Sequence, residues 1–315
     1  MDKIAFIVAL LAATLRLATP LIFAGLGGVF SERAGVVNIG LEGMMTIGAF
    51  FAVWGTHITH GNYFIGILVA VIAAGTIAAL HAFLSITLRA DQIISGTAIN
   101  LFSTAFASFL IFVLFEGKGG QTDSVGVLPY LPEALTKVLN NIPVIGPLIN
   151  GLNWFVILAI VLVFVSTFVI FKTPLGLRIR SVGEHPSAAD TLGISVYGIR
   201  YLCVIISGVL AGLGGATLAL STAGIYKEGM VAGRGFIALA AMIFGNWNPK
   251  GTMWACLLFG FAEAFQIQAQ GFGWHLPTEF YSALPYILTM LALAGFVGKT
   301  VPPAADGIPY EKGKR

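Results

Sequence analysis

One stretch of this chain decides how its fold is read: Ser31-Glu32-Arg33-Ala34-Gly35-Val36-Val37-Asn38-Ile39-Gly40-Leu41-Glu42-Gly43. It lies between two strongly apolar runs and combines charged and amide side chains with three glycines. Charged groups inside a bilayer are costly unless they face protein or water, so they commonly mark a pathway. Irregular backbone at membrane depth is tolerated only where protein or a cavity surrounds it. The stretch therefore indicates either a helix break beside a transport path or an ordinary loop between two helices.

The composition identifies the class of protein. The chain has 315 residues, of which 57% are hydrophobic and only 10% charged, and its mean hydropathy is +0.91. Soluble domains carry about a quarter charged residues. We therefore expect a polytopic membrane protein that forms a single transmembrane domain over residues 1–315. Cys203 and Cys256 lie apart in apolar segments and are expected to be packing residues.

Apolar runs of helical length recur along the whole chain. A membrane-spanning helix needs about 20 apolar residues, and the sequence predicts an all-α bundle of about nine spans, with eight and ten as alternatives. The runs cover residues 4–30, 44–58, 65–88, 93–115, 154–171, 201–223, 234–247, 252–270 and 280–298. The first contains Arg16 and Pro20 and is long for one upright helix, so a short interfacial helix followed by a spanning one is an alternative there. The run at 234–247 is short and bounded by glycines, which is typical of a discontinuous helix in a transport path.

The basic residues predict the orientation, because cytoplasmic loops are enriched in lysine and arginine. If residues 172–200 form a cytoplasmic loop, residues 116–153 form an extracytoplasmic loop and residues 299–315 a cytoplasmic tail. That choice places on the cytoplasmic side Arg33, Arg89, Lys172, Arg178, Arg180, Arg200, Lys250, Lys299, Lys312, Lys314 and Arg315. It leaves on the outside Lys118, Lys137, Lys227 and Arg234. Residues 133–140 could form a short amphipathic helix in the outer loop.

Polar side chains within the apolar runs are candidates for the translocation path. They are Asn38, Glu42, Asn100, Asn246, Glu263 and Gln266. Glu263, Gln266 and Gln270 share one helix face, since they are spaced i, i+3 and i+7. Such a face can hydrogen-bond a polar solute, but it can equally hold helices together, which is the commoner use. His81 has no acidic partner at helical spacing in its own span, so we interpret it as a packed or pore-edge histidine.

The sequence carries no catalytic motif and no metal-ligand pattern. Gly-x-x-x-x-Gly-Lys-Ser/Thr is absent, so the chain has no P-loop of its own. There is no His-Glu-x-x-His and no cysteine pair at ligand spacing. We therefore expect no enzyme activity and no bound cofactor.

The basic segment 172–200 contains a short helix signal. Pro186 suits the first position of a helix, and residues 187–192 can form a turn or two that end at Gly193. Small residues on this helix would allow close docking against another protein. A lipid-facing amphipathic loop is the alternative.

Several motifs together resemble a known family. They are residues 32–43, Pro174-Leu175-Gly176-Leu177-Arg178, Gly183-Glu184-His185-Pro186 with Ala188-Ala189, Gly193-Ile194, Ser207-Gly208, Ala211-Gly212 and Gly233-Arg234-Gly235-Phe236-Ile237-Ala238-Leu239-Ala240. The chain resembles the integral-membrane permease subunits of bacterial ATP-binding-cassette importers for ribose, other simple sugars and branched-chain amino acids. Residues 32–43 are especially similar to the permeases that import nucleosides with a Bmp-type binding lipoprotein. The family usually has Asn where this chain has His185, which weakens any role given to that side chain.

The resemblance implies partners and a coupling site. Two permease chains, the second a different one, would form a nucleoside pore in the bacterial plasma (inner) membrane. A cytoplasmic ATPase would use ATP and Mg²⁺, and an extracytoplasmic lipoprotein would deliver substrate. The coupling helix on the ATPase would comprise Glu184, His185, Pro186, Ser187, Ala188, Ala189, Asp190 and Gly193. A simple-sugar importer is the alternative substrate class. An ion-coupled transporter that uses Glu42 and Glu263 is a further alternative. A membrane enzyme that uses Glu263 or His81 is disfavoured, because the sequence shows no nucleophile–base arrangement. Membrane lipid is an expected contact and nucleic acid is not.

Overall fold

The computed structural model describes residues 3–117, 119–129, 149, 152–270, 283, 287, 290 and 300–313. In this part of the chain the regular structure is helical apart from one isolated bridge between Gln121 and Lys227. The amphipathic helix expected at 133–140, most of the outer loop and nearly all of the run at 280–298 lie outside the described residues.

The helices follow the apolar runs. In chain order they are α1 (Lys3–Arg33), α2 (Leu41–Ile58), α3 (Tyr63–Ala82) with the π-helical turn η1 (Phe83–Thr87), α4 (Gln92–Leu114), α7 (Trp154–Lys172), α8 (Pro174–Glu184), α9 (Pro186–Thr191), α10 (Val196–Leu218) with η2 (Ala219–Ala223), α11 (Arg234–Phe244) and α12 (Pro249–Ala269). Five helical segments of the described chain are long and apolar enough to cross a membrane. The architecture is therefore that of a polytopic helical membrane protein, while the count of nine spans stays a prediction.

The first apolar run forms a single helix. Pro20 lies inside α1 without ending it, so an interfacial helix followed by a separate span does not occur. Proline removes one backbone hydrogen bond, and neighbouring helices make such a loss tolerable in membrane proteins. Helix α10 approaches so closely here that a Cβ added at Gly214 would lie 2.8 Å from the carbonyl oxygen of Pro20.

Small residues allow the central helices to pack closely. Helices α1, α2 and α10 form the interior of the bundle, α3 packs against α2 and α10, and α11 and α12 lie against α1. A Cβ added at Gly48 of α2 would lie 2.5 Å from the Cα of Gly212 in α10, so only glycine fits there. Membrane helices associate through close packing of this kind, because the hydrophobic effect does not drive apolar side chains out of lipid.

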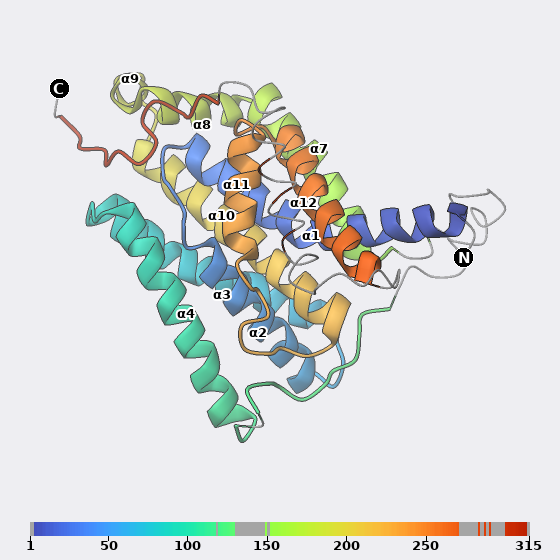
Figure 1. The fold of residues 1–315 in the computed structure, drawn as a ribbon. Coiled ribbons are helices and arrows are strands. Elements are labelled where there is room, and N and C mark those ends of the chain that lie inside the picture. Colours follow the sequence, from blue (N-terminus) through green and yellow to red (C-terminus); the bar gives the residue numbers. More distant parts are fainter. Residues whose placement is uncertain are drawn as a thin grey trace.

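The bundle has two chemically different ends. One end contains the C-terminus of α1, the α3–α4 turn, α8, α9 and residues 300–313, which contact one another; we call it the basic end. At the opposite end, residues 122–128 bond to residues 220–226, and the hydroxyl of Tyr63 donates to the Val125 carbonyl at 3.1 Å. Figure 1 shows the tail running beside α8 and α9, and α4 standing at the side of the bundle. Segments predicted to be cytoplasmic therefore lie together at one end, and the side of the membrane that this end faces stays a prediction.

Candidate translocation path and coupling surface

The stretch 31–43 is a true break between two helices. Helix α1 ends at Arg33 and α2 begins at Leu41. Gly35 has φ +83°, a left-handed value that glycine adopts without strain. The hydroxyl of Ser31 donates to the Val36 carbonyl at 2.6 Å, which closes the turn. Non-helical backbone thus lies inside the bundle, as the glycines and charges indicated.

Side chains from two other helices satisfy the backbone of the break. Gln92 of α4 accepts the Val37 N–H at 2.7 Å, and His81 of α3 is 3.1 Å from the Val37 carbonyl oxygen. Asn100 of α4 donates to the Ile39 carbonyl at 3.0 Å and accepts the Gly43 N–H at 2.8 Å. Buried backbone polar groups that lack partners cost about 1–3 kcal/mol each. These side chains therefore make the irregular segment possible.

Asn38 is fully buried within the same region. Its side-chain Nδ2 donates to the hydroxyl of Ser207 in α10 at 2.9 Å. Its side-chain oxygen, Oδ1, has no hydrogen-bond partner among the described residues. The side chain therefore attaches the break to α10.

The carboxylate of Glu42 caps the short helix α11. Its two oxygens accept the backbone N–H groups of Gly233 and Gly235, each at 2.7 Å. The N-terminus of a helix carries unpaired N–H groups and a partial positive charge, which a carboxylate neutralises. Glu42 thus connects the first turn of α2 to the first turn of α11.

Arg234, between these two glycines, forms an ion pair with Glu263 of α12, and both side chains are largely buried. The same guanidinium donates to the carbonyls of Met230 and Val231. Two of the path candidates, Glu42 and Glu263, therefore both bind the first turn of α11.

The remaining path candidates lie apart from this cluster. Asn246 lies just beyond the other end of α11, where its side chain accepts the Val301 N–H at 3.0 Å and its carbonyl accepts Arg33. Gln266 is half-buried, one turn beyond Glu263 on α12. Asn246 is therefore placed at the basic end, where it joins α11 to the tail.

The short helix expected after Pro186 forms as α9. Pro186 occupies the first turn of α9, and Gly193 follows the helix with φ +80°. Ser187 and Ala188 are exposed, whereas Ala189 is buried against Val182, Val196 and Tyr310. The helix presents one small-residue face outward and packs the other inward.

The helix α8 was not expected from the sequence. Thr173 caps it by accepting the Gly176 N–H at 3.2 Å, and Pro174 occupies its first turn. A threonine followed by proline is a helix-start signal that could have revealed it. Glu184 and His185, which join α8 to α9, are exposed.

Residues 300–313, which we call the tail, lie across the basic end. Ala305 donates to the Gly183 carbonyl at 2.8 Å, and Ala304 donates to the Glu184 carboxylate at 3.2 Å. Lys312 lies 3.8 Å from Asp190 of α9. The tail is thereby attached to α8 and α9.

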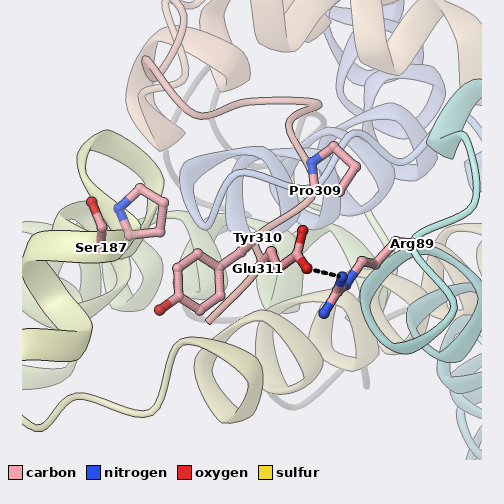
Figure 2. A pocket seen from close by; sticks show the side chains of 6 residues that line it. Arg89, Ser187, Pro309, Tyr310 and Glu311 are labelled. Carbon is pink, nitrogen blue, oxygen red and sulfur yellow. Dashed lines mark ion pairs between the residues drawn. The ribbon is translucent and has the colours of Figure 1, made fainter. Parts of the chain in front are cut away.

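A cleft of about 370 Å³ opens beside α9. Its walls are Arg89, Pro186, Ser187, Pro309, Tyr310 and Glu311. Figure 2 shows the ion pair between Arg89 and Glu311, 3.1 Å long, with Tyr310 between it and Ser187. The cleft therefore combines the α3–α4 turn, the α9 helix and the tail in one surface.

Sequence reasoning missed a buried polar cluster beneath the tail. The Trp247 indole N–H donates to Glu32 at 2.6 Å, and the Asp306 carboxyl lies against Glu32. Arg200, which is 1% exposed, donates to the carbonyls of Ala34 and Ile308. Burial raises the pKa of Asp306 to about 7. The cluster joins the ends of α1 and α11 to the tail.

The described residues contain no group of three or more His, Cys, Asp or Glu side chains that could hold a metal ion. The polar side chains described above form hydrogen bonds to the backbone, pair with one another or cap helices. The arrangement suits the support of a path between helices, with a docking surface at the basic end.

Comparison with known proteins gives consistent matches. The family model for the branched-chain amino acid transport system / permease component matches residues 10–293. The guanosine ABC transporter permease protein NupQ of Bacillus subtilis is 45% identical, with both chains covered completely. The nucleoside ABC transporter permease protein NupC of Lactococcus lactis is 44% identical over 94% of each chain. The putative glucose ABC transporter permease protein TsgC13 of Haloferax volcanii is 39% identical over 84% of this chain and 79% of its own.

A more distant match comes from the same organism as NupQ. The guanosine ABC transporter permease protein NupP of Bacillus subtilis is 28% identical over 78% of this chain and 70% of its own. No solved structure matches the chain significantly. The family match over most of the chain and the helical bundle agree with each other, and the chain therefore belongs to the permease components of the branched-chain amino acid transport system family, as a multi-pass membrane protein.

Proposed function

We propose that this chain forms the pore for nucleosides in an ATP-driven importer. The observation that carries the proposal is the identity of about 45% to NupQ over the full length of both chains, together with the 44% identity to NupC. Both relatives are named for nucleoside transport. At this similarity the packed helices and the break at 31–43 are expected to be shared.

The partners follow from the same relationship. ATP hydrolysis takes place on a separate cytoplasmic ATPase, and an extracytoplasmic lipoprotein delivers the substrate. Because NupP and NupQ of one organism both match this chain, the second permease is a different chain. The basic end is cytoplasmic, as its lysines and arginines indicate.

The exposed face of α9 docks on the ATPase. Its outward residues are Ser187 and Ala188, and Leu192 just beyond it is 81% exposed. Small outward side chains would let a groove on another protein approach this helix closely. The cleft in Figure 2 adjoins this face and belongs to the same surface.

The path runs beside the broken helices. Asn38 and Asn100 hold the break, and Glu42 with Glu263 holds the start of α11. Discontinuous helices of this kind line substrate paths in other transporters. These residues are assigned to positioning the path walls.

Competition uptake tests the proposal. Cells with the complete transporter take up labelled guanosine while unlabelled purine nucleosides, pyrimidine nucleosides, ribose, galactose and glucose compete. Displacement by nucleosides alone is the expected result. Displacement by sugars would establish the alternative suggested by the similarity to TsgC13. Uptake that persists without the ATPase and collapses with the ion gradient would overturn both.

A further inference from the structure

Basic side chains from four helices lie along the last turns of α7. The guanidinium carbon of Arg33, at the end of α1, is 5.8 Å from the ring centre of Phe171, and that of Arg180 in α8 is 5.5 Å away. The ammonium of Lys250, in the first turn of α12, is 5.7 Å from the ring centre of Phe164. Lys172 ends α7 itself and is exposed.

These cations are poorly neutralised by the protein. Within the described parts of the chain none of Arg33, Lys172, Arg180 and Lys250 forms an ion pair. The Nε of Arg180 is buried without a hydrogen-bond partner in the same described set. Glu184 is the carboxylate that acts on Arg33, and it already accepts the Ala304 N–H. The Arg33 guanidinium donates to the carbonyls of Trp247 and Asn246, but the two guanidiniums beside one ring still repel each other, so an anion bound here would be stabilised.

The surface next to this cluster is apolar and exposed. Phe164 and Phe168 of α7 are 56% and 61% exposed, and Val161 and Val165 on the same helix are about half exposed. Because α7 is one of the helices apolar enough to cross a membrane, this surface suits acyl chains.

We propose that the basic cluster, formed by Arg33, Lys172, Arg180 and Lys250, binds the phosphate headgroup of an anionic phospholipid of the inner leaflet, whose acyl chains lie on Phe164 and Phe168. Basic pockets between membrane helices on the cytoplasmic side bind anionic headgroups. Arginine and lysine donate to phosphate oxygens in charge-assisted hydrogen bonds, and the exposed Lys172 and the partly exposed Arg180 can supply them here.

The adjoining apolar surface indicates that the ligand is a phospholipid and not soluble phosphate. A free phosphate would use the cations alone and leave Phe164 and Phe168 without a role. A lipid uses both features at once, with its headgroup at the helix ends and its chains along α7. The site does not depend on which solute is transported.

The test measures lipid retained by the complete transporter. The complex is purified from membranes that contain phosphatidylglycerol and phosphatidylethanolamine, washed in mild detergent, and its bound lipid is counted by mass spectrometry. We expect wild type to retain phosphatidylglycerol selectively and the variant Arg180→Gln/Lys250→Gln to retain roughly ten-fold less. The matched control Lys312→Gln removes an exposed cation from the tail at the same end and should retain the wild-type amount.

Two further experiments use the wild-type protein, so their results do not depend on whether a variant folds. The first locates the bound lipid, and the second distinguishes lipid from soluble phosphate. A photoactivatable phosphatidylglycerol added to wild type should label residues 161–180 and the start of α12. Inorganic phosphate at millimolar concentration should leave the bound lipid in place. Equal retention by the double variant, labelling confined to other helices, protection of this surface by a protein subunit, or displacement by phosphate would each overturn the proposal.

Discussion

The carboxylate of Glu42 accepts the backbone N–H of Gly233 at 2.7 Å, and this contact joins helices that are far apart in the sequence. The second oxygen accepts the N–H of Gly235 at the same distance. Helix α11 has only 11 residues, too few to be stable without tertiary support. Its position therefore depends on its neighbours, and Glu42 supplies the contact at its N-terminus.

Removal of the Glu42 carboxylate should impair uptake. Glu42→Ala leaves two helix N–H groups without their acceptor, and hydrogen bonds to charged groups contribute about 1.5–3 kcal/mol each. We expect uptake to fall by about ten-fold or more at equal amounts of assembled transporter. Glu42→Gln keeps one acceptor oxygen and should show an intermediate loss. Glu228→Ala, an exposed carboxylate at the opposite end, serves as the control. Wild-type uptake by Glu42→Ala would show that α11 needs no cap.

The Arg234–Glu263 pair should behave as a coupled unit. Arg234→Gln and Glu263→Gln each leave a partly buried charge without its partner, so both should lower the melting temperature of the purified complex. The double variant should be less destabilised than the sum of the two. Contacting charges usually show coupling of about 0.5–3 kcal/mol in such a cycle. Additive effects of the two changes would mean that the contact does not contribute to stability.

Neighbouring alanines in α9 should give different phenotypes. Ala188 is exposed, so Ala188→Trp should leave the permease folded and membrane-inserted but abolish ATPase pull-down and uptake. Ala189 is 2% exposed and packs against Tyr310, so Ala189→Trp should also lower thermal stability through overpacking, by about 1–3 kcal/mol. Normal ATPase association by Ala188→Trp would refute the docking assignment of α9.

Attachment of the tail should depend on pH through Asp306. Burial raises the pKa of this carboxyl to about 7, and the charged groups that face it are Glu32 of α1 and Arg200 of α10. The attached tail therefore binds a proton more readily than the free tail does. Attachment is strongest at acidic pH, weakens as pH rises from the ordinary aspartate range through about 7, and levels off above it.

Hydrogen exchange of residues 300–313 between pH 6 and 8.5, corrected for intrinsic rates, measures this effect. Protection should fall with pH in wild type. Asp306→Asn, which cannot ionise, should show a clearly shallower profile, and Glu311→Gln on the same tail should keep the wild-type slope. A slope in Asp306→Asn as steep as that of wild type would assign the titration to another group.

The sequence predicted the helices and the break well, since each rests on local chemistry. A run such as residues 154–171 must be helical in lipid because only helix satisfies its backbone there, and α7 covers that run. Pro186 and Gly193 similarly predicted α9. Pro20 was misleading because α1 is packed tightly against α10 at this point, and such a tertiary contact leaves no local pattern in the sequence.

The long-range contacts around the break and around the start of α11 could largely not be predicted from the sequence. Glu32 with Trp247, and Glu42 with Gly233, join segments whose separation along the chain carries no periodic signal. Glu42 and Asn100 could be named as polar residues in apolar surroundings, but their partners could not. Asn246 was grouped with the path by its neighbours in sequence, whereas the structure places it beside the tail.

The cap on α11 also bears on which ligands this helix start can accept. An uncapped helix start attracts phosphate, since its N–H groups and dipole are free to receive an anion. Here Glu42 already occupies that position, and Arg234 in the same turn is paired with Glu263. A phosphate group would therefore find the N–H groups of Gly233 and Gly235 and the guanidinium of Arg234 already engaged at this helix start.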